Sequence, residues 1–105
     1  MIIACDFDGV IHAHKNPIAG RRMGAPIEGA KEAVQALKAQ GATIVIHSIW
    51  AHEKGVKTIA DWMEYYQIPY DSITNIKTAA DIYLDDKAMR FETWEKFLAD
   101  LYTAS

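Results

Sequence analysis

The sequence predicts an α/β fold: an open, Rossmann-like three-layer sandwich with a mostly parallel sheet. Short β-branched runs alternate with segments of helical periodicity, in the order β-α-β-α-β-β-α. The first run is continuously apolar, which is typical of a strand buried on both faces, so we expect helices on both sides of the sheet. With 105 residues, we expect the chain, residues 1–105, to form one domain.

The first half of the chain contains two strands and one helix by this pattern. Residues 1–5 are apolar and run into an acidic turn, after which residues 12–25 form a loop rich in Gly, Pro, His and Arg. Pro26 is expected to open a helix, because proline suits the first helical position, and Gly41 to end it. Residues 42–48 follow as a second β-branched strand.

The second half repeats the alternation with shorter strands. Residues 52–67 have helical spacing, residues 68–74 are extended because proline disfavours helix at the preceding position, and residues 81–84 form a last short apolar run. A final helix is indicated by one apolar stripe, formed by Phe91, Trp94, Leu98 and Leu101.

The composition narrows the classes of partner. The formal net charge is −3, so a nucleic-acid end is a conceivable substrate but is not favoured. No apolar run approaches the ~20 residues of a membrane span, and no basic segment precedes an apolar one as in a signal peptide. The single cysteine, Cys5, suits a reducing compartment. We therefore expect a cytoplasmic protein without a membrane partner.

Polar residues cluster where the predicted strands end. Asp6 and Asp8 follow the first strand, Ser48 ends the second, Lys77 precedes the last, and Asp85-Asp86 follow it. Ligands of open α/β sheets bind at these carboxyl ends. Several carboxylates raise one another's pKa unless a cation neutralises them, and Mg²⁺ with its oxygen ligands suits that task. Ser48 and Lys77 add a hydroxyl donor and a positive charge for a phosphoryl group.

The spacing of the first acidic pair has a geometric meaning. In an extended strand, residues i and i+2 point to the same face, so Asp6 and Asp8 can approach one substrate. Gly9 then lets the chain turn away tightly. A carboxylate can also act as a nucleophile and form an aspartyl phosphate.

In order along the chain, "DFDGVI", "IVIHS", Lys77 within "NIKTAAD", and "IYLDD" resemble the four motifs of the haloacid dehalogenase (HAD) superfamily, whose members mostly hydrolyse phosphate monoesters. The resemblance runs from Asp6 to Asp86. It implies a magnesium-dependent phosphatase acting on a phosphorylated small molecule or a nucleotide.

The resemblance also implies a role for each matching residue. Asp6 corresponds to the nucleophile and Asp8 to the general acid and base. Ser48 corresponds to the hydroxyl that holds the phosphoryl group, and Lys77 to the lysine that neutralises the charge of the nucleophile and of the phosphoryl group. Asp85, with Asp86 as the less certain ligand, corresponds to the motif that binds Mg²⁺ together with Asp6 and the backbone carbonyl of Asp8.

Two departures from the family pattern concern the substrate. Ile49 and Trp50 follow Ser48 where small members often carry an arginine, and Trp50 could instead stack on a base or sugar. No segment is long enough for a cap domain, so residues 12–25 are the candidate flap. The expected substrate-binding set is Gly9, Ser48, Ile49, Trp50, Lys77 and, more weakly, Arg21.

Other interpretations remain open at this stage. The chain could be a phosphoacceptor module of the receiver type, or a catalytically slow protein that binds a phosphorylated ligand. Asp85-Asp86 could cap a helix. His12 could line the entrance of the site, but a surface histidine explains it at least as well, and His47 is better explained as a hydrogen-bonded core residue. Residues 64–66 could support a homodimer.

Overall fold

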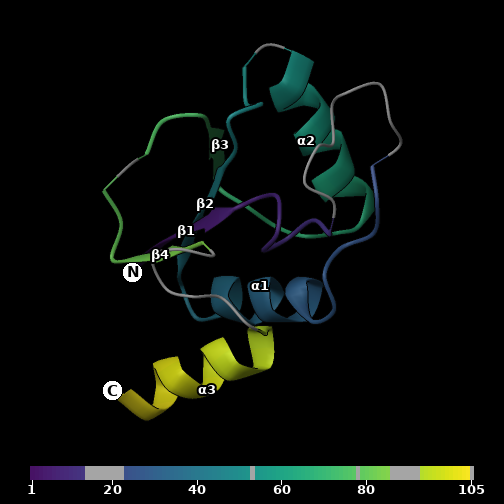
Figure 1. Cartoon of the computed structure of the whole chain (residues 1–105). Coiled ribbons are helices and arrows are strands. Elements are labelled where there is room, and N and C mark those ends of the chain that lie inside the picture. The colour runs from purple at the N-terminus through teal and green to yellow at the C-terminus, as the bar shows by residue number, and fades with distance from the viewer. Residues whose placement is uncertain (14–22, 53, 78, 86–92, 105) are drawn as a thin grey trace.

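The structure of the chain is a computed structural model that describes residues 1–13, 23–52, 54–77, 79–85 and 93–104 (Figure 1). In chain order these residues form β1 (Ile2–Asp6), α1 (Ala30–Ala39), β2 (Thr43–His47), α2 (Lys54–Tyr65), β3 (Ser72–Thr74), β4 (Ile82–Leu84) and α3 (Trp94–Ala104). The strands that the structure describes make one four-stranded sheet in the order β3-β2-β1-β4, and each neighbouring pair is parallel. The predicted α/β fold with its parallel sheet is confirmed.

The register of the sheet aligns the carboxyl ends of its strands. Asp6 of β1 pairs with His47 of β2, which in turn pairs with Thr74 of β3. On the other side of β1, Cys5 pairs with Leu84 of β4. The residues that follow these positions therefore emerge at one edge of the sheet, as the strand-end argument requires.

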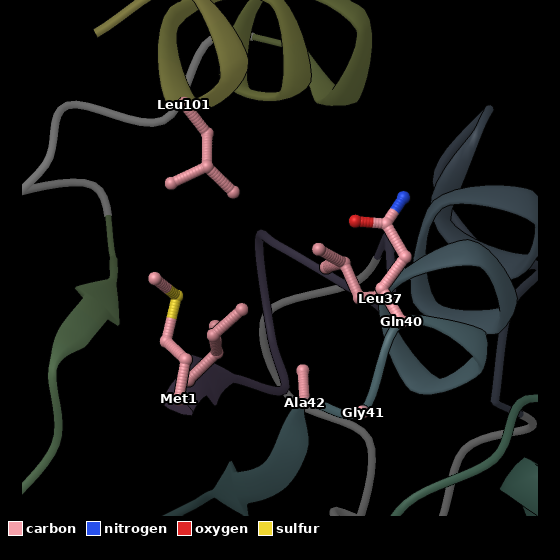
Figure 2. Close-up of a pocket in the computed structure, with 7 residues that line it drawn as sticks. Met1, Leu37, Gln40, Gly41, Ala42 and Leu101 are labelled. Atoms are coloured by element: carbon pink, nitrogen blue, oxygen red, sulfur yellow. The ribbon is translucent and has the colours of Figure 1, made fainter. Parts of the chain in front are cut away.

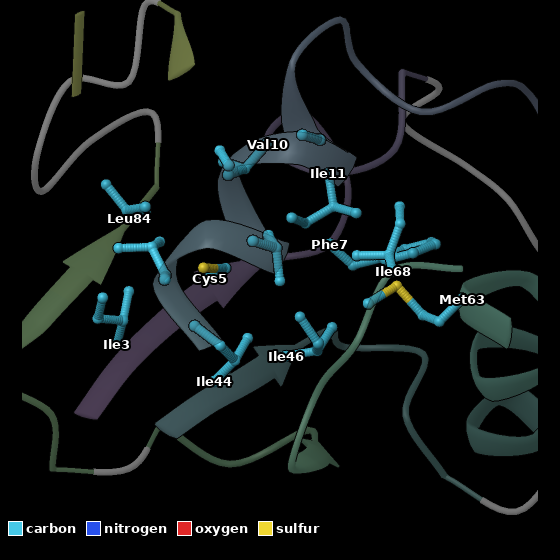
Figure 3. Close-up of a cluster of buried hydrophobic side chains, with 14 of the residues drawn as sticks. Ile3, Cys5, Phe7, Val10, Ile11, Ile44, Ile46, Met63, Ile68 and Leu84 are labelled. Carbon is cyan, nitrogen blue, oxygen red and sulfur yellow. The ribbon is translucent and has the colours of Figure 1, made fainter. Parts of the chain in front are cut away.

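One hydrophobic cluster holds the helices to the sheet (Figure 3). The strands contribute alternate residues, which share one face of the sheet because side chains alternate along a strand; they are Ile3, Cys5, Ile44, Ile46 and Leu84. All three described helices add buried side chains to this cluster, among them Val34, Met63 and Phe97. No helix in the described part of the chain is long and apolar enough to cross a membrane.

The two faces of the sheet carry different sets of buried side chains. The buried side chains of the described helices converge on one face, whereas Ala4 and Val45, buried on the opposite face, lie outside the cluster. The crossovers through α1 and α2 step in the same direction, and right-handed crossovers then place both helices on the same side. The return from β3 to β4 contains no helix in its described residues, 75–77 and 79–81.

The first helix begins later than the sequence suggests. The expectation that Pro26 opens it is wrong, because α1 starts at Ala30, after Gly29 with φ +87°. The backbone N–H of Ile27 donates to the carbonyl of Ile11, which ties this segment to the loop after β1 rather than to the helix. Gly41, with φ +92°, follows the end of α1 as predicted. For the final helix, Phe91 lies outside the described residues.

Asp71 joins α1 to the sheet and gives a stability prediction. Its carboxylate accepts hydrogen bonds from Lys38 Nζ and from the backbone N–H of Ile44, both at 2.7 Å, and these bonds hold the pKa of Asp71 below its usual value. We expect Asp71→Ala to lower the free energy of unfolding by about 1 kcal/mol at neutral pH, the small value reflecting a solvent-screened pair.

The same pair predicts a pH dependence. The folded-state pKa of Asp71 is depressed, so its contribution is present above the unfolded pKa and is lost as the pH falls through the folded one. Urea unfolding of the wild type and of Asp71→Ala is measured at neutral pH and at a pH below the usual pKa of a carboxyl group. The difference in unfolding free energy between the two proteins should shrink in acid. A difference that grows in acid would contradict this account.

Candidate active site

Three groups expected to take part in chemistry lie at the carboxyl edge of the sheet. Asp6 is the last residue of β1, Ser48 follows β2, and Asp85 follows β4. Ser48 and Asp85 are both only 5% exposed. Asp85 lies close enough to Asp6 for its negative charge to raise the pKa of the Asp6 carboxyl. The structure therefore brings together two of the carboxylates that the sequence analysis assigned to one site.

Asp6 is held through one of its two oxygens. His47 Nδ1 and the Tyr83 hydroxyl each lie 3.3 Å from Asp6 Oδ1. Within the described residues, Oδ2 has no hydrogen bond and is available to a substrate or cation. Burial is the larger cause that raises the pKa of Asp6, followed by the charge of Asp85, whereas His47 and Tyr83 lower it.

Asp8 lies beyond the end of β1 rather than within it. The strand ends at Asp6, so strict alternation does not extend to Asp8, and the chain turns at Gly9 with φ +88°. The turn is closed by the Gly9 N–H, which donates to the carbonyl of His12. Asp8 nevertheless lies near Asp6. The charge of Asp6 adds to the effect of burial and raises the pKa of the Asp8 carboxyl.

Ser48 presents a hydroxyl whose orientation is fixed by the next turn. Its Oγ accepts a hydrogen bond of 3.1 Å from the backbone N–H of Trp50, which leaves the O–H free to donate to another acceptor. Trp50 is half-buried, whereas Ile49 between them is 70% exposed. Ile49 therefore presents an apolar side chain beside the buried hydroxyl.

Lys77 contacts the candidate site through the ring of Tyr83. Its Nζ lies 5.5 Å from the centroid of the Tyr83 ring, within the range of a cation–π contact. Tyr83 is the residue whose hydroxyl contacts Asp6, and burial together with that carboxylate raises the pKa of Tyr83. Among the described residues, no hydrogen bond or ion pair joins Lys77 to Asp6. The expected neutralisation of Asp6 by Lys77 is therefore indirect in this conformation.

The donor set fits a hard cation in part. Asp6 and Asp85 are neighbouring carboxylates, and Mg²⁺ is commonly held by one or two carboxylates, with waters and phosphate oxygens completing its shell. The described residues contain no group of three or more His, Cys, Asp or Glu side chains arranged to hold a metal ion. Asp86, the fourth expected ligand, and Arg21, the weak substrate-binding candidate, lie outside the described residues.

Three further residues adjoin the candidate site without having been assigned to it. His47 and Tyr83 contact Asp6, and His12 lies 3.0 Å from Asp8. The expectation of a surface position for His12 is wrong, because the side chain is fully buried. The contact of His47 follows from the sheet register, which pairs it with Asp6. The sequence places both residues at strand ends, but their contact depends on the register in which β1 and β2 pair.

The described apolar cavity near β1 is a separate feature (Figure 2). It has a volume of about 190 Å³ and lies between α1, α3 and the start of β1. Its lining residues are Met1, Ile3, Leu37, Gln40, Gly41, Ala42 and Leu101. None of these side chains is an acid or a base, and the cavity lies near the start of β1, whereas the candidate site lies where the strands end.

The comparisons with known proteins address the fold. The chain matches no family model and no curated protein. It shares its fold with a conserved protein from Bacteroides thetaiotaomicron. That solved structure superposes with a TM-score of 0.82 at 21% sequence identity, over 100% of this chain and 92% of the other. The likeness concerns the arrangement of the whole chain, not its activity.

Proposed function

We propose that the chain is a magnesium-dependent phosphomonoester hydrolase of HAD type that works through an aspartyl phosphate on Asp6. The observation that carries the proposal is the grouping of two carboxylates, Asp6 and Asp85, beside Asp8 and the buried hydroxyl of Ser48 at one sheet edge. Such a set favours phosphoryl transfer, in which positioning and charge neutralisation provide most of the catalysis.

The first half of the reaction uses the two acids of "DFDGVI". The carboxylate of Asp6 attacks phosphorus in line with the leaving oxygen, and the bond from phosphorus to that oxygen breaks as Asp8 donates it a proton. Burial and the charge of Asp6 raise the pKa of Asp8, which favours the protonated form that a general acid needs. The products are a free alcohol and Asp6 as an acyl phosphate.

The second half reverses the role of Asp8. Its carboxylate takes a proton from water, the oxygen of that water attacks phosphorus, and the bond to Asp6 breaks to release inorganic phosphate. Ser48 donates its O–H to a phosphoryl oxygen, and Lys77 adds positive charge from above Tyr83. Held by Asp6, Asp85 and the carbonyl of Asp8, with Asp86 as the less certain ligand, Mg²⁺ would neutralise phosphoryl charge throughout.

The deciding experiment is hydrolysis of a panel of phosphate esters with and without magnesium. The panel contains p-nitrophenyl phosphate, phosphorylated sugars, nucleotides and an oligonucleotide with a terminal phosphate. We expect phosphate release that chelation by EDTA abolishes and added Mg²⁺ restores, because neighbouring carboxylates repel without a cation. Absence of turnover on every ester, or turnover indifferent to EDTA, would contradict the proposal.

The position of Lys77 favours a second candidate, a protein that binds a phosphorylated ligand and hydrolyses it slowly. Lys77 lies over Tyr83, and the Tyr83 hydroxyl rather than an ammonium contacts Asp6. Saturable binding of inorganic phosphate without turnover would favour this candidate. Long-lived phosphorylation of Asp6 by acetyl phosphate would instead favour a receiver-type module.

Gly9 provides a test of the loop geometry beside Asp8. Gly9 and Gly41 have similar positive φ angles, +88° and +92°, and an added Cβ would meet no atom within 4 Å at either position. We expect Gly9→Ala and Gly41→Ala each to cost about 1 kcal/mol of stability, since both strain only the backbone. Only Gly9→Ala should also lower phosphate release, by roughly tenfold, through displacement of Asp8. Equal activities of the two folded variants would contradict this.

A further inference from the structure

His12 is a fully buried side chain directly behind Asp8. Its Nδ1 lies 3.0 Å from Asp8 Oδ1, and its Nε2 lies 2.8 Å from the backbone nitrogen of Gly24. The ring thus joins the proposed acid, on one side of the loop that begins after β1, to the segment that returns towards α1. No other described side chain forms a hydrogen bond with Asp8.

The contact with Gly24 fixes which nitrogen of the ring carries the hydrogen. A backbone N–H can only donate, so Nε2 must accept and therefore carries no hydrogen. In the neutral ring the hydrogen then lies on Nδ1, which donates to Asp8 Oδ1. One backbone amide therefore determines the direction of the hydrogen bond to Asp8.

Aromatic neighbours restrict the orientation of this ring. His12 stacks on Phe7 with centroids 5.0 Å apart and an angle of 6° between the planes. The edge of Trp62 meets it at 5.2 Å and 81°. Trp62 is itself anchored, because its Nε1 donates to the carbonyl of Gly24 at 2.9 Å. The ring therefore cannot turn without displacing two packed aromatic side chains.

We infer that His12 is a positioning residue for Asp8, which holds Oδ1 of the carboxyl so that Oδ2 is presented to the leaving oxygen of the substrate. Asp8 Oδ2 has no hydrogen bond among the described residues, so it is the oxygen available for proton transfer. The inference rests on the proposed function, since it assigns His12 a part in the step that Asp8 performs.

The leaving group provides a way to observe this role. A stable leaving anion such as p-nitrophenolate departs without much help from an acid, whereas phenolate, which is more basic, needs the proton from Asp8 in the transition state. A loss of Asp8 positioning should therefore slow phenyl phosphate more than p-nitrophenyl phosphate. A general loss of folded protein would slow the two substrates equally.

Two substitutions separate the two contacts of the ring. In His12→Asn the side-chain amide nitrogen occupies the place of Nδ1 and can still donate to Asp8, but the contact with Gly24 is lost. In His12→Gln the longer amide reaches the place of Nε2 and can accept from Gly24, but the donor to Asp8 is lost. Trp62→Phe is the matched control, because it keeps an aromatic ring against His12 and removes the other hydrogen bond to Gly24.

The measurement is kcat/KM for both aryl phosphates with Mg²⁺, on variants shown to be folded by thermal melting. For His12→Gln we expect the preference for p-nitrophenyl phosphate over phenyl phosphate to widen roughly tenfold, whereas for His12→Asn and Trp62→Phe it stays within about twofold of the wild type. An unchanged preference in His12→Gln, or an equal widening in all three variants, overturns the inference and leaves the proposed function standing.

The tautomer is tested separately, in the unmodified protein. Imidazole ¹⁵N shifts should show Nδ1 protonated and Nε2 bare for His12, and the reverse assignment overturns the inference even in an active enzyme. A wild-type chain that hydrolyses neither aryl phosphate overturns the proposed function instead, and that failure is recognised before any variant is compared.

Discussion

Replacement of Asp6 by asparagine is expected to lower phosphate ester hydrolysis by roughly a thousandfold or more, the scale seen when a covalent nucleophile is removed. An amide cannot form the acyl phosphate, so the first step has no substitute pathway in the site. The substitution should leave the fold intact, because the amide oxygen can still accept from His47 and Tyr83, which both contact Oδ1 of Asp6.

The measurement has two parts. Steady-state release of p-nitrophenolate gives the loss of turnover, and acid quenching with a labelled phosphate ester shows whether phosphate is bound covalently in the wild type and absent in the variant. Asp61→Asn is the matched control: the same chemical change on α2, at a carboxylate that forms an ion pair with the exposed Lys57. If Asp6→Asn keeps the activity of Asp61→Asn, Asp6 is not the nucleophile.

The sequence predicted the order of the strands and helices along the chain, and the polar residues at the strand ends, because both depend on local patterns. Continuous apolar runs identify buried parallel strands, and the polar residue after each run must emerge at the same edge. Asp6, Ser48 and Asp85 were placed at that edge by this rule alone, and the structure brings them there. No contact between distant residues was needed for this part.

The contacts around those residues could not be predicted in the same way. His47 meets Asp6 because β1 and β2 pair in one particular register, and a shift of one residue would turn the histidine to the other face. His12 is buried where the chain returns at Gly24, twelve residues later, and the backbone N–H of Gly24 donates to His12 Nε2. Loop closures of this kind depend on tertiary packing, for which the local pattern of "IHAH" gives no signal.

The error at the start of α1 has the same origin. Proline at position 26 is a local signal for a helix start, but the N–H of Ile27 donates a hydrogen bond to the carbonyl of Ile11. The helix therefore begins only after Gly29, where a φ of +87° turns the chain into α1. A tertiary hydrogen bond outweighed a local preference, as is common for intrinsic propensities that differ by less than about 1 kcal/mol.

Trp94 connects the last helix to the loop that contains Asp8. The side chain is 1% exposed, and its Nε1 donates a hydrogen bond of 3.1 Å to the carbonyl of Val10, two residues after Asp8. Its Cβ also lies 3.4 Å from the position that a Cβ on Gly29 would occupy, so the two segments pack closely. α3 thereby packs against the loop that contains Asp8 and Val10, although it contains none of the proposed catalytic residues.

We therefore expect Trp94→Ala to lower the free energy of unfolding by about 3–5 kcal/mol, the range for loss of a buried tryptophan. Trp94→Phe should cost less, about 1–3 kcal/mol, mainly because the Val10 carbonyl loses its buried donor. Urea unfolding followed by circular dichroism measures both. Tyr65→Ala is the control: this aromatic side chain is 77% exposed, so its removal should change stability by no more than about 0.5 kcal/mol. A loss for Trp94→Ala as small as that of Tyr65→Ala would show that α3 does not support the loop, and the positions of Val10 and Asp8 would then need another explanation.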